Sequence, residues 1–140
     1  MMPVFTEFVE MRTSGFNEMY DITDDVAAII ADCSLKDGTV TVFVPGATGG
    51  VTTVEYEPGL RKDIPEAFEK IAPMGVDYHH DENWNDGNGF SHVRASLLGP
   101  SLVVPFIGKK LTLGAWQQIV FIDFDNRERH RKLVVQIMGE

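Results

Sequence analysis

The chain has 140 residues, of which 44% are hydrophobic and 24% charged, a composition typical of a globular protein rather than a disordered one. Its 12 Lys and Arg face 21 Asp and Glu, and the net charge of −9 argues against a broad nucleic-acid or anionic-lipid surface. The single cysteine, Cys33, excludes an intrachain disulfide and favours a cytoplasmic protein. We expect neither a signal peptide nor a membrane span, and one domain over residues 1–140.

The first part of the chain mixes strand and helix patterns. Residues 4–11 mix apolar and polar positions in a way that suits a partly exposed strand. Hydrophobic residues from Val26 to Cys33 then follow the spacing i, i+3, i+4 and i+7, which predicts a helix with Thr23 as its N-cap. Cys33 is interpreted as a core residue of this helix, because neither a nearby base nor a CxxC partner is visible.

Residues 39–44 and 51–54 are rich in β-branched side chains and predict two strands. The Gly-rich linker 45–50 between them is not a phosphate loop of the Walker type, because no Lys follows and no helix pattern begins. Two interpretations of this linker stay open, a simple strand connection and a cradle for an anion.

The rest of the chain predicts one more helix and then strands. The spacing of Leu60, Ile64, Phe68 and Ile71 is helical, but Pro65 suggests that the regular helix begins near Ile64 or Pro65 and ends before Pro73. Short apolar runs over 93–98, 102–106, 111–113, 117–124 and 133–138 predict strands. Two helices among seven or eight strands indicate an α+β domain with largely antiparallel, sandwich-like sheets.

Three of the four histidines lie within residues 78–92, a segment whose Asn, Asp and Gly content predicts a loop. His80 and His92 could converge on a metal with a carboxylate, although their spacing matches no standard zinc motif. A metal or catalytic role and a hydrogen-bonded loop both remain open. His79 and His80 cannot both point inward if the segment is extended.

Acidic and basic residues elsewhere could complete such a site. Glu55 and Glu57 would share one side of a strand, with Asp63 near a helix start, and could bind a cation or simply face water. Arg94 would share a strand face with His92 and could meet an anionic substrate group. The basic run 127–132 is interpreted as a solvated hairpin or a subunit contact rather than a nucleic-acid site, and Trp116 as a core residue.

Four ordered motifs, at residues 78–81, 91–99, 101–105 and 111–119, make the chain resemble the YjbQ family. Members of this family have been described both as uncharacterised proteins and as secondary thiamine-phosphate synthases. The resemblance covers nearly the whole chain. It implies an α+β fold of antiparallel sheets with two helices, and a homotrimer whose sheets pack around the threefold axis.

The family's His-Thr-Ser-Ala signature is replaced here by Pro-Gly-Ala-Thr, with Pro45 in place of the histidine, which weakens any three-histidine metal site. Carried over by position, the resemblance implies catalytic roles for one set of residues, namely His80, His92, Glu55, Asp63 and Arg94. It implies ligand binding by a second set, namely Asn88, Trp116, Gln117 and the loop residues Gly46, Thr48 and Gly49. The expected metal ligands are His80, His92 and Glu55.

The resemblance leads to three alternative functions. The first is a thiamine-phosphate synthase-like transferase, in which carboxylates hold Mg²⁺, Arg94 and loop amides contact the phosphates, and a histidine transfers protons. The second is a metal-dependent hydrolase of a small phosphorylated metabolite, with Zn²⁺ or a similar ion. The third is a non-catalytic trimer that binds a small ligand or metal. No nucleic-acid or membrane partner is expected for any of them.

Overall fold

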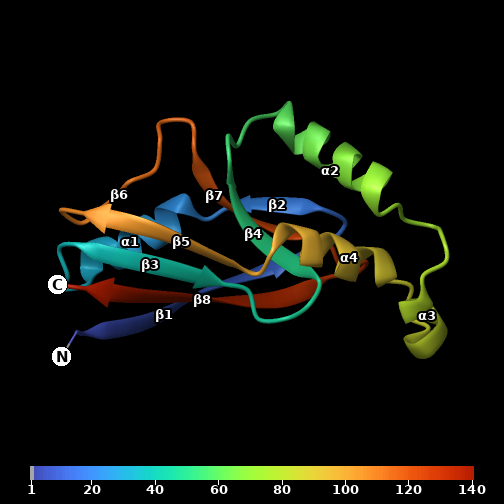
Figure 1. Cartoon of the computed structure of the whole chain (residues 1–140), viewed down its shortest axis with the longest axis horizontal. Helices are drawn as coiled ribbons and strands as arrows, with labels where there is room; N and C mark the ends of the chain where they lie inside the picture. The colour runs from blue at the N-terminus through green and yellow to red at the C-terminus, as the bar shows by residue number, and fades with distance from the viewer. Residues whose placement is uncertain (1) are drawn as a thin grey trace.

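The computed structural model describes residues 2–140 and shows an α+β fold built on two antiparallel sheets (Figure 1). The larger sheet has the strand order β1-β8-β3-β5-β6, with β1 at Val4–Thr13, β8 at Arg129–Gly139, β3 at Gly38–Phe43, β5 at Ser101–Ile107 and β6 at Lys110–Leu111. The smaller has the order β2-β7-β4, with β2 at Glu18–Asp21, β7 at Gln118–Asp123 and β4 at Gly49–Val54. The predicted fold class is confirmed.

Strand β7 joins two hydrophobic cores because both of its faces are buried. Ile119 and Phe121 point into the main core, where α1 (Thr23–Asp32) packs with the inner face of the larger sheet. Val120 and Ile122 point the other way, into a second core that also holds side chains of α2 (Leu60–Ile71) and α4 (Gly89–Leu98). A strand that is covered on both faces has no polar alternation, which explains its continuous apolar sequence.

The helices differ from the sequence prediction in number and extent. There are four rather than two among residues 2–140, because α3 (His79–Trp84) and α4 occupy residues that were expected to be loop and strand. The predicted strand 93–98 is wrong: Phe90, Arg94 and Ala95 form the buried stripe of a helix, while Val93 and Leu97 are exposed. A large cation on the buried stripe conceals the helical period from a hydrophobicity pattern.

Two helix starts also differ from expectation. Helix α2 begins at Leu60, with Pro65 inside it rather than at its start. Thr23 is the first residue of α1 instead of its N-cap, and its backbone N–H donates to the Asp21 carboxylate at 3.0 Å. No helix in the described part of the chain is long and apolar enough to cross a membrane.

Helix α4 lies close to strand β4 (Figure 1). Gly49 and Gly50 belong to β4, so the connection from β3 is shorter than the predicted linker. A Cβ atom at Gly50 would lie 2.8 Å from Leu98 Cδ2 and 2.9 Å from the Gly99 carbonyl oxygen. Glycine at this position therefore allows the end of α4 to pack directly on the strand.

Candidate functional site

A pocket of about 310 Å³ lies where four segments meet. These segments are the loop from β3 to β4, helix α3 with the turn after it, the first turn of α4, and the start of β8. The lining residues are small or polar except for one tryptophan: Gly46, Ala47, Thr48, His80, Trp84, Asp86, Asn88, His92, Arg129 and Arg131. Concave sites with a few convergent polar groups are typical of small-molecule binding.

Two histidines from different helices form one wall of the pocket. The rings of His80 in α3 and His92 in α4 lie 4.1 Å apart between centroids and are tilted by 42°. Burial lowers the pKa of His92 below its ordinary value of 6.5, and the neighbouring His80 ring lowers it further, while Asp86 and Asp125 oppose the shift. The neutral imidazole of His92 is therefore the main form at neutral pH, and it can accept a proton.

His80 is oriented by polar groups of the turn after α3. Asp86 Oδ1 lies 3.3 Å from His80 Nε2, and the Asn88 side-chain amide lies 3.1 Å from the same nitrogen. Turning the Asn88 amide by 180° places its nitrogen 2.9 Å from Asp86 Oδ1, so that it donates to the carboxylate. By contrast, the neighbouring His79 side chain is fully exposed and lies outside the pocket.

The opposite wall rests on two buried carboxylates. Asp125 accepts hydrogen bonds from Arg129 Nε at 2.8 Å and from the Thr48 hydroxyl at 2.9 Å. Burial acts to raise the pKa of Asp125, but hydrogen bonds from the Asn126 N–H, Thr48 and Arg129 outweigh it and hold the pKa below 3.8. Asp125 is therefore ionised at neutral pH and fixes Arg129.

Arg131 is held in the same way by Asp123. Its Nε and Nη2 atoms each donate to this carboxylate at 2.8 Å, and Nη2 also donates to the Thr48 hydroxyl at 2.8 Å. The remaining nitrogen, Nη1, faces Gly46, where a Cβ atom would approach it to 3.3 Å. Within residues 2–140 no side chain or carbonyl accepts a hydrogen bond from Nη1, so this nitrogen is a fixed donor available to a ligand.

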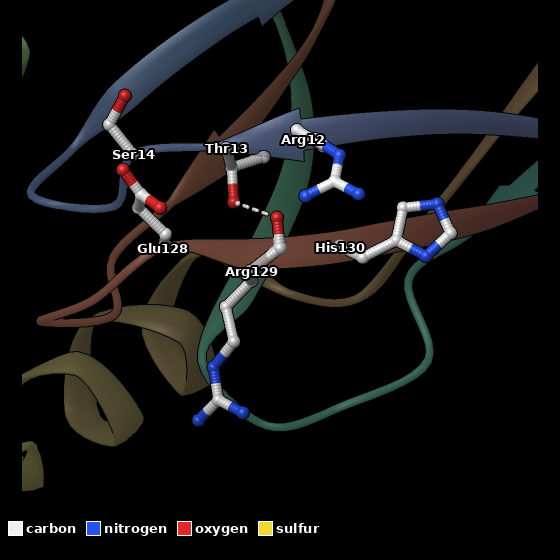
Figure 2. A pocket seen from close by; sticks show the side chains of 6 residues that line it. All are labelled: Arg12, Thr13, Ser14, Glu128, Arg129 and His130. Carbon is white, nitrogen blue, oxygen red and sulfur yellow. Dashed lines mark hydrogen bonds between the residues drawn. The ribbon is translucent and has the colours of Figure 1, made fainter.

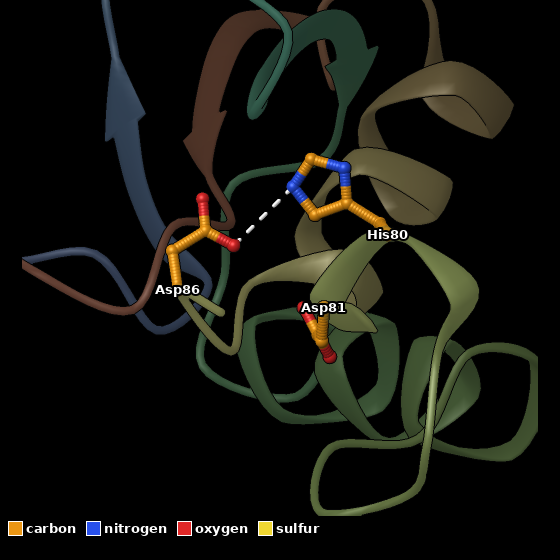
Figure 3. A group of neighbouring side chains, drawn as sticks. All are labelled: His80, Asp81 and Asp86. Carbon is orange, nitrogen blue, oxygen red and sulfur yellow. Dashed lines mark ion pairs between the residues drawn. The ribbon is translucent and has the colours of Figure 1, made fainter. Parts of the chain in front are cut away.

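One group of side chains in this region fits a metal ion. His80, Asp81 and Asp86 each offer a ligand atom, and these atoms lie within 4.8 Å of one another (Figure 3). A nitrogen and two carboxylates form a donor set that Zn²⁺ and similar ions accept. Asp81 already accepts a hydrogen bond from the Gly89 N–H at 3.0 Å, so a metal would share this carboxylate with the start of α4.

The structure brings together only part of the residue set expected from the sequence. His80, His92, Asn88, Gly46 and Thr48 line the pocket, and Gly49 lines a cavity that adjoins it. The other predicted residues do not line it within one chain: Glu55, Asp63, Arg94, Trp116 and Gln117. The expected metal set of His80, His92 and Glu55 is therefore not assembled by a single chain.

Arg94 has a structural position instead of the predicted place beside a substrate. It lies on a helix, is fully buried, and donates to the Ala72 carbonyl oxygen at 2.9 Å, Asn17 Oδ1 at 2.7 Å and Glu69 at 2.6 Å. These bonds connect α4 to the end of α2 and to the turn before β2. Each of its three nitrogens donates to a protein group, and Arg94 does not line the pocket.

Three other expectations change for local reasons. Strand β4 ends at Val54, so Glu55 and Glu57 are not strand neighbours, and Glu57 instead accepts the Gly59 N–H at 2.7 Å before α2. The side chain of Gln117 donates to Thr53 at 3.0 Å. Trp116, which was predicted to be a core residue, is 76% exposed.

Sequence reasoning missed Asp86 and the pairs of Asp123 with Arg131 and of Asp125 with Arg129. The basic run 127–132 was interpreted as solvated or as a subunit contact, yet Arg131 is buried. The sequence did contain one signal for the burial of Arg131. Arg129 and Arg131 share the odd-numbered face of the strand with the apolar residues Leu133, Val135 and Ile137, and this face is the buried one.

A second, larger depression of about 370 Å³ lies at the paired ends of β1 and β8 (Figure 2). Arg12 and His130 are register partners there and lie on neighbouring strands. The Arg129 guanidinium points away from both of them, as Figure 2 shows, toward its ion pair with Asp125 at 2.7 Å. The charged groups of this depression therefore do not converge, and the smaller pocket with the histidine pair is the better candidate site.

Comparison with known proteins supports the resemblance noted in the sequence. The family model described as "UPF0047 protein YjbQ-like" matches residues 7–140. A UPF0047 protein of Archaeoglobus fulgidus is 40% identical over 128 residues, covering 91% of this chain and 97% of the relative. YugU of Bacillus subtilis is 30% identical over 132 residues, covering 94% of this chain and 97% of that protein.

Solved structures agree with the sequence matches. A YbjQ-like protein of unknown function from Sulfolobus solfataricus superimposes with a TM-score of 0.93 at 31% identity, with all of both chains covered. A protein of the yjbq/upf0047 family from Clostridium acetobutylicum gives a TM-score of 0.84 at 35% identity, covering 94% of this chain and 98% of that one. The chain therefore belongs to the UPF0047 (YjbQ-like) family.

Proposed function

We propose that the chain is a small enzyme that binds the phosphate of a small metabolite in this pocket and uses His92 as a proton acceptor. The observation that carries the proposal is the meeting of a histidine pair, 4.1 Å apart, with an arginine donor fixed by a buried carboxylate in one pocket. A neutral imidazole beside bound substrate can remove a proton from an attacking group and return it to a leaving group.

The pocket can attract an anionic group through a single directed hydrogen-bond donor rather than through a net positive charge. The charges of Asp123 and Asp125 cancel those of Arg131 and Arg129, so no broad positive field results. What remains is a directional donor at Arg131 Nη1. Buried pairing holds this donor in place before substrate arrives, so its orientation costs little during the reaction.

The first reaction to assay is the one that the family resemblance implies, the joining of a pyrimidine diphosphate to a thiazole phosphate. Complementation of a thiamine-requiring strain with wild-type protein should be lost with His92→Ala. Glu55→Gln serves as the matched control, because Glu55 is exposed and outside the pocket of its own chain. Growth of the His92→Ala strain at the wild-type rate would remove His92 from the mechanism. Loss of growth with Glu55→Gln would instead indicate a site completed by another subunit.

A second candidate, a metal-dependent hydrolase, is favoured by the clustering of His80, Asp81 and Asp86. In it, these three residues replace the expected His80, His92 and Glu55 as metal ligands, and the ion supplies a polarised water or phosphate contact. Metal analysis of protein purified without chelators tests this function. Stoichiometric zinc that is lost in Asp86→Asn but kept in Glu55→Gln supports it, whereas no bound metal in wild type argues against it. A non-catalytic ligand-binding protein would show ligand-induced thermal stabilisation without turnover.

We also propose that the outer face of the larger sheet is the subunit contact of a homotrimer. Phe8 on β1 and Phe43 on β3 flank Val134 on β8 in register, and both phenylalanines are more than 40% exposed. An exposed row of large apolar side chains is typical of an interface. Light scattering should give three times the chain mass for wild type and a smaller mass for Phe8→Glu. The control Leu97→Glu should keep the wild-type mass, because Leu97 is exposed on α4 and does not belong to the larger sheet.

A further inference from the structure

A second cavity of about 220 Å³ adjoins the pocket. The two share Gly46, Ala47 and His92, so they meet at the β3–β4 loop and at one histidine ring. The only titratable side chain in the walls of the second cavity is the imidazole of His92, and the other lining residues are mainly small: Gly46, Ala47, Gly49, Ala95, Ser96 and Pro100.

Helix α4 makes the two cavities one continuous groove. Asn88, at the N-cap of the helix, and His92 face the first cavity, whereas His92, Ala95 and Ser96 face the second. Positions i, i+4, i+7 and i+8 form a single stripe along a helix. The β3–β4 loop supplies the facing wall of both cavities, so the groove runs along α4 from its N-terminal turn toward its C-terminal half.

The two ends of the groove differ in chemistry. One end holds Asp86, Arg129 and Arg131, while the other offers Ala95, Pro100 and one hydroxyl from Ser96. The Ser96 hydroxyl donates to the His92 carbonyl oxygen at 2.8 Å, so it is already satisfied within the helix. The second compartment therefore favours an uncharged, mainly apolar group over a second anion.

Size narrows the class of ligand. An apolar protein cavity of about 150 Å³ is sufficient to bind benzene. The second compartment, at about 220 Å³, has room for one ring of that kind. A long or branched chain on the ring would extend out of the compartment into solvent, because Ser96 and Pro100 in its wall are exposed.

We propose that this compartment binds the single-ring organic part of a phosphate ester whose phosphate lies at the arginine end of the groove. The proposal rests on the proposed function and specifies its substrate class. It places His92 beside the atoms that join the ring to the phosphate, because this residue lines both cavities. A ligand of this shape occupies the whole groove, whereas inorganic phosphate occupies only one end.

Calorimetric titration with phenyl phosphate and with inorganic phosphate tests the proposal. Burial of about 60 Å² of ring surface should make phenyl phosphate bind on the order of tenfold more tightly to wild type. Ser96→Phe fills the compartment from an exposed position and should erase this gain without changing phosphate binding. Leu97→Phe, on the adjacent exposed residue that lines neither cavity, is the control and should keep the gain.

The possible results distinguish a failure of the proposed ring compartment from a failure of the proposed phosphate-binding function. Equal affinity of wild type for the two compounds would overturn the proposed compartment, and this measurement does not depend on any variant. An equal loss of both affinities in Ser96→Phe would overturn it as well. Both results would leave the phosphate site standing. If neither compound binds to wild type, the proposed function itself fails.

Discussion

The buried ion pair of Asp123 with Arg131 provides the sharpest test of how the site is built. Asp123 is fully buried and Arg131 is 8% exposed. The carboxylate accepts two bonds of 2.8 Å from the guanidinium and one of 2.6 Å from the Thr13 hydroxyl. The substitution Asp123→Asn keeps the shape of this side chain but removes its charge, and so leaves a buried guanidinium without a counter-ion.

Removal of one partner from a buried ion pair costs about 3–5 kcal/mol. The asparagine oxygen still accepts one hydrogen bond, so we expect a loss near the lower limit, about 3 kcal/mol in the free energy of unfolding. For a domain of this size that corresponds to a decrease of roughly 10 °C in Tm. Urea denaturation followed by circular dichroism measures the change, and phosphate binding should weaken with it because Arg131 is no longer fixed.

Glu10→Gln is the matched control, because it removes a carboxylate that faces another β8 cation, Lys132, across the same pair of strands. This pair spans 3.8 Å, and both side chains are 54% exposed, so its loss should cost no more than about 0.5 kcal/mol. The reasoning is refuted if Asp123→Asn unfolds at the wild-type urea concentration, or if the two substitutions cost the same.

Three further predictions follow from the polar contacts. Because the pKa of Asp125 lies below 3.8 in the folded protein, its carboxylate stabilises the fold above that pH and loses this effect as the pH falls through the folded pKa. Asp125→Asn should thus be less stable than wild type at pH 7, and urea titrations should show the difference shrinking below pH 3.8; a constant difference contradicts this. In chelator-treated protein, His80→Gln should raise the pKa of His92 in an NMR titration, since the electrostatic interaction with the His80 ring that lowers this pKa is removed, and no rise would count against it. Arg94→Lys should lower Tm, because lysine cannot replace three guanidinium bonds, whereas Trp116→Ala, at an exposed position, should leave Tm unchanged; equal effects would disprove the structural role of Arg94.

The candidate site was predictable where chemistry is concentrated in one short segment. His80, Asn88 and His92 lie within residues 78–92, and short helices with a tight turn keep such neighbours close in space. The assignment of Glu55 and Asp63 to the same site failed within one chain. These two residues were carried over by position from the family resemblance, and they lie far from His80 and His92 along the sequence, where no local pattern fixes distances.

The secondary structure was predictable where burial follows a simple period. The alternation in β8, with Leu133, Val135 and Ile137 buried, agrees with the strand predicted over 133–138. Helix α4 was mistaken for a strand because Arg94 occupies its buried stripe. A buried cation is invisible to a hydrophobicity pattern, and only its partners from α2 and from the turn before β2 show why it can be buried.

By itself the sequence determined the α+β class, the antiparallel strands and the family, because these depend on local periodicity and on ordered motifs. The net charge of −9 is not carried by surface groups alone, because the tertiary structure buries two of the acidic residues and pairs them with arginines. Only the tertiary structure decided that Asp123 and Asp125 fix the arginines of the pocket and that α4 joins two cavities into one groove. Such contacts connect residues far apart along the chain, and their free energy depends on burial and geometry that no local pattern contains.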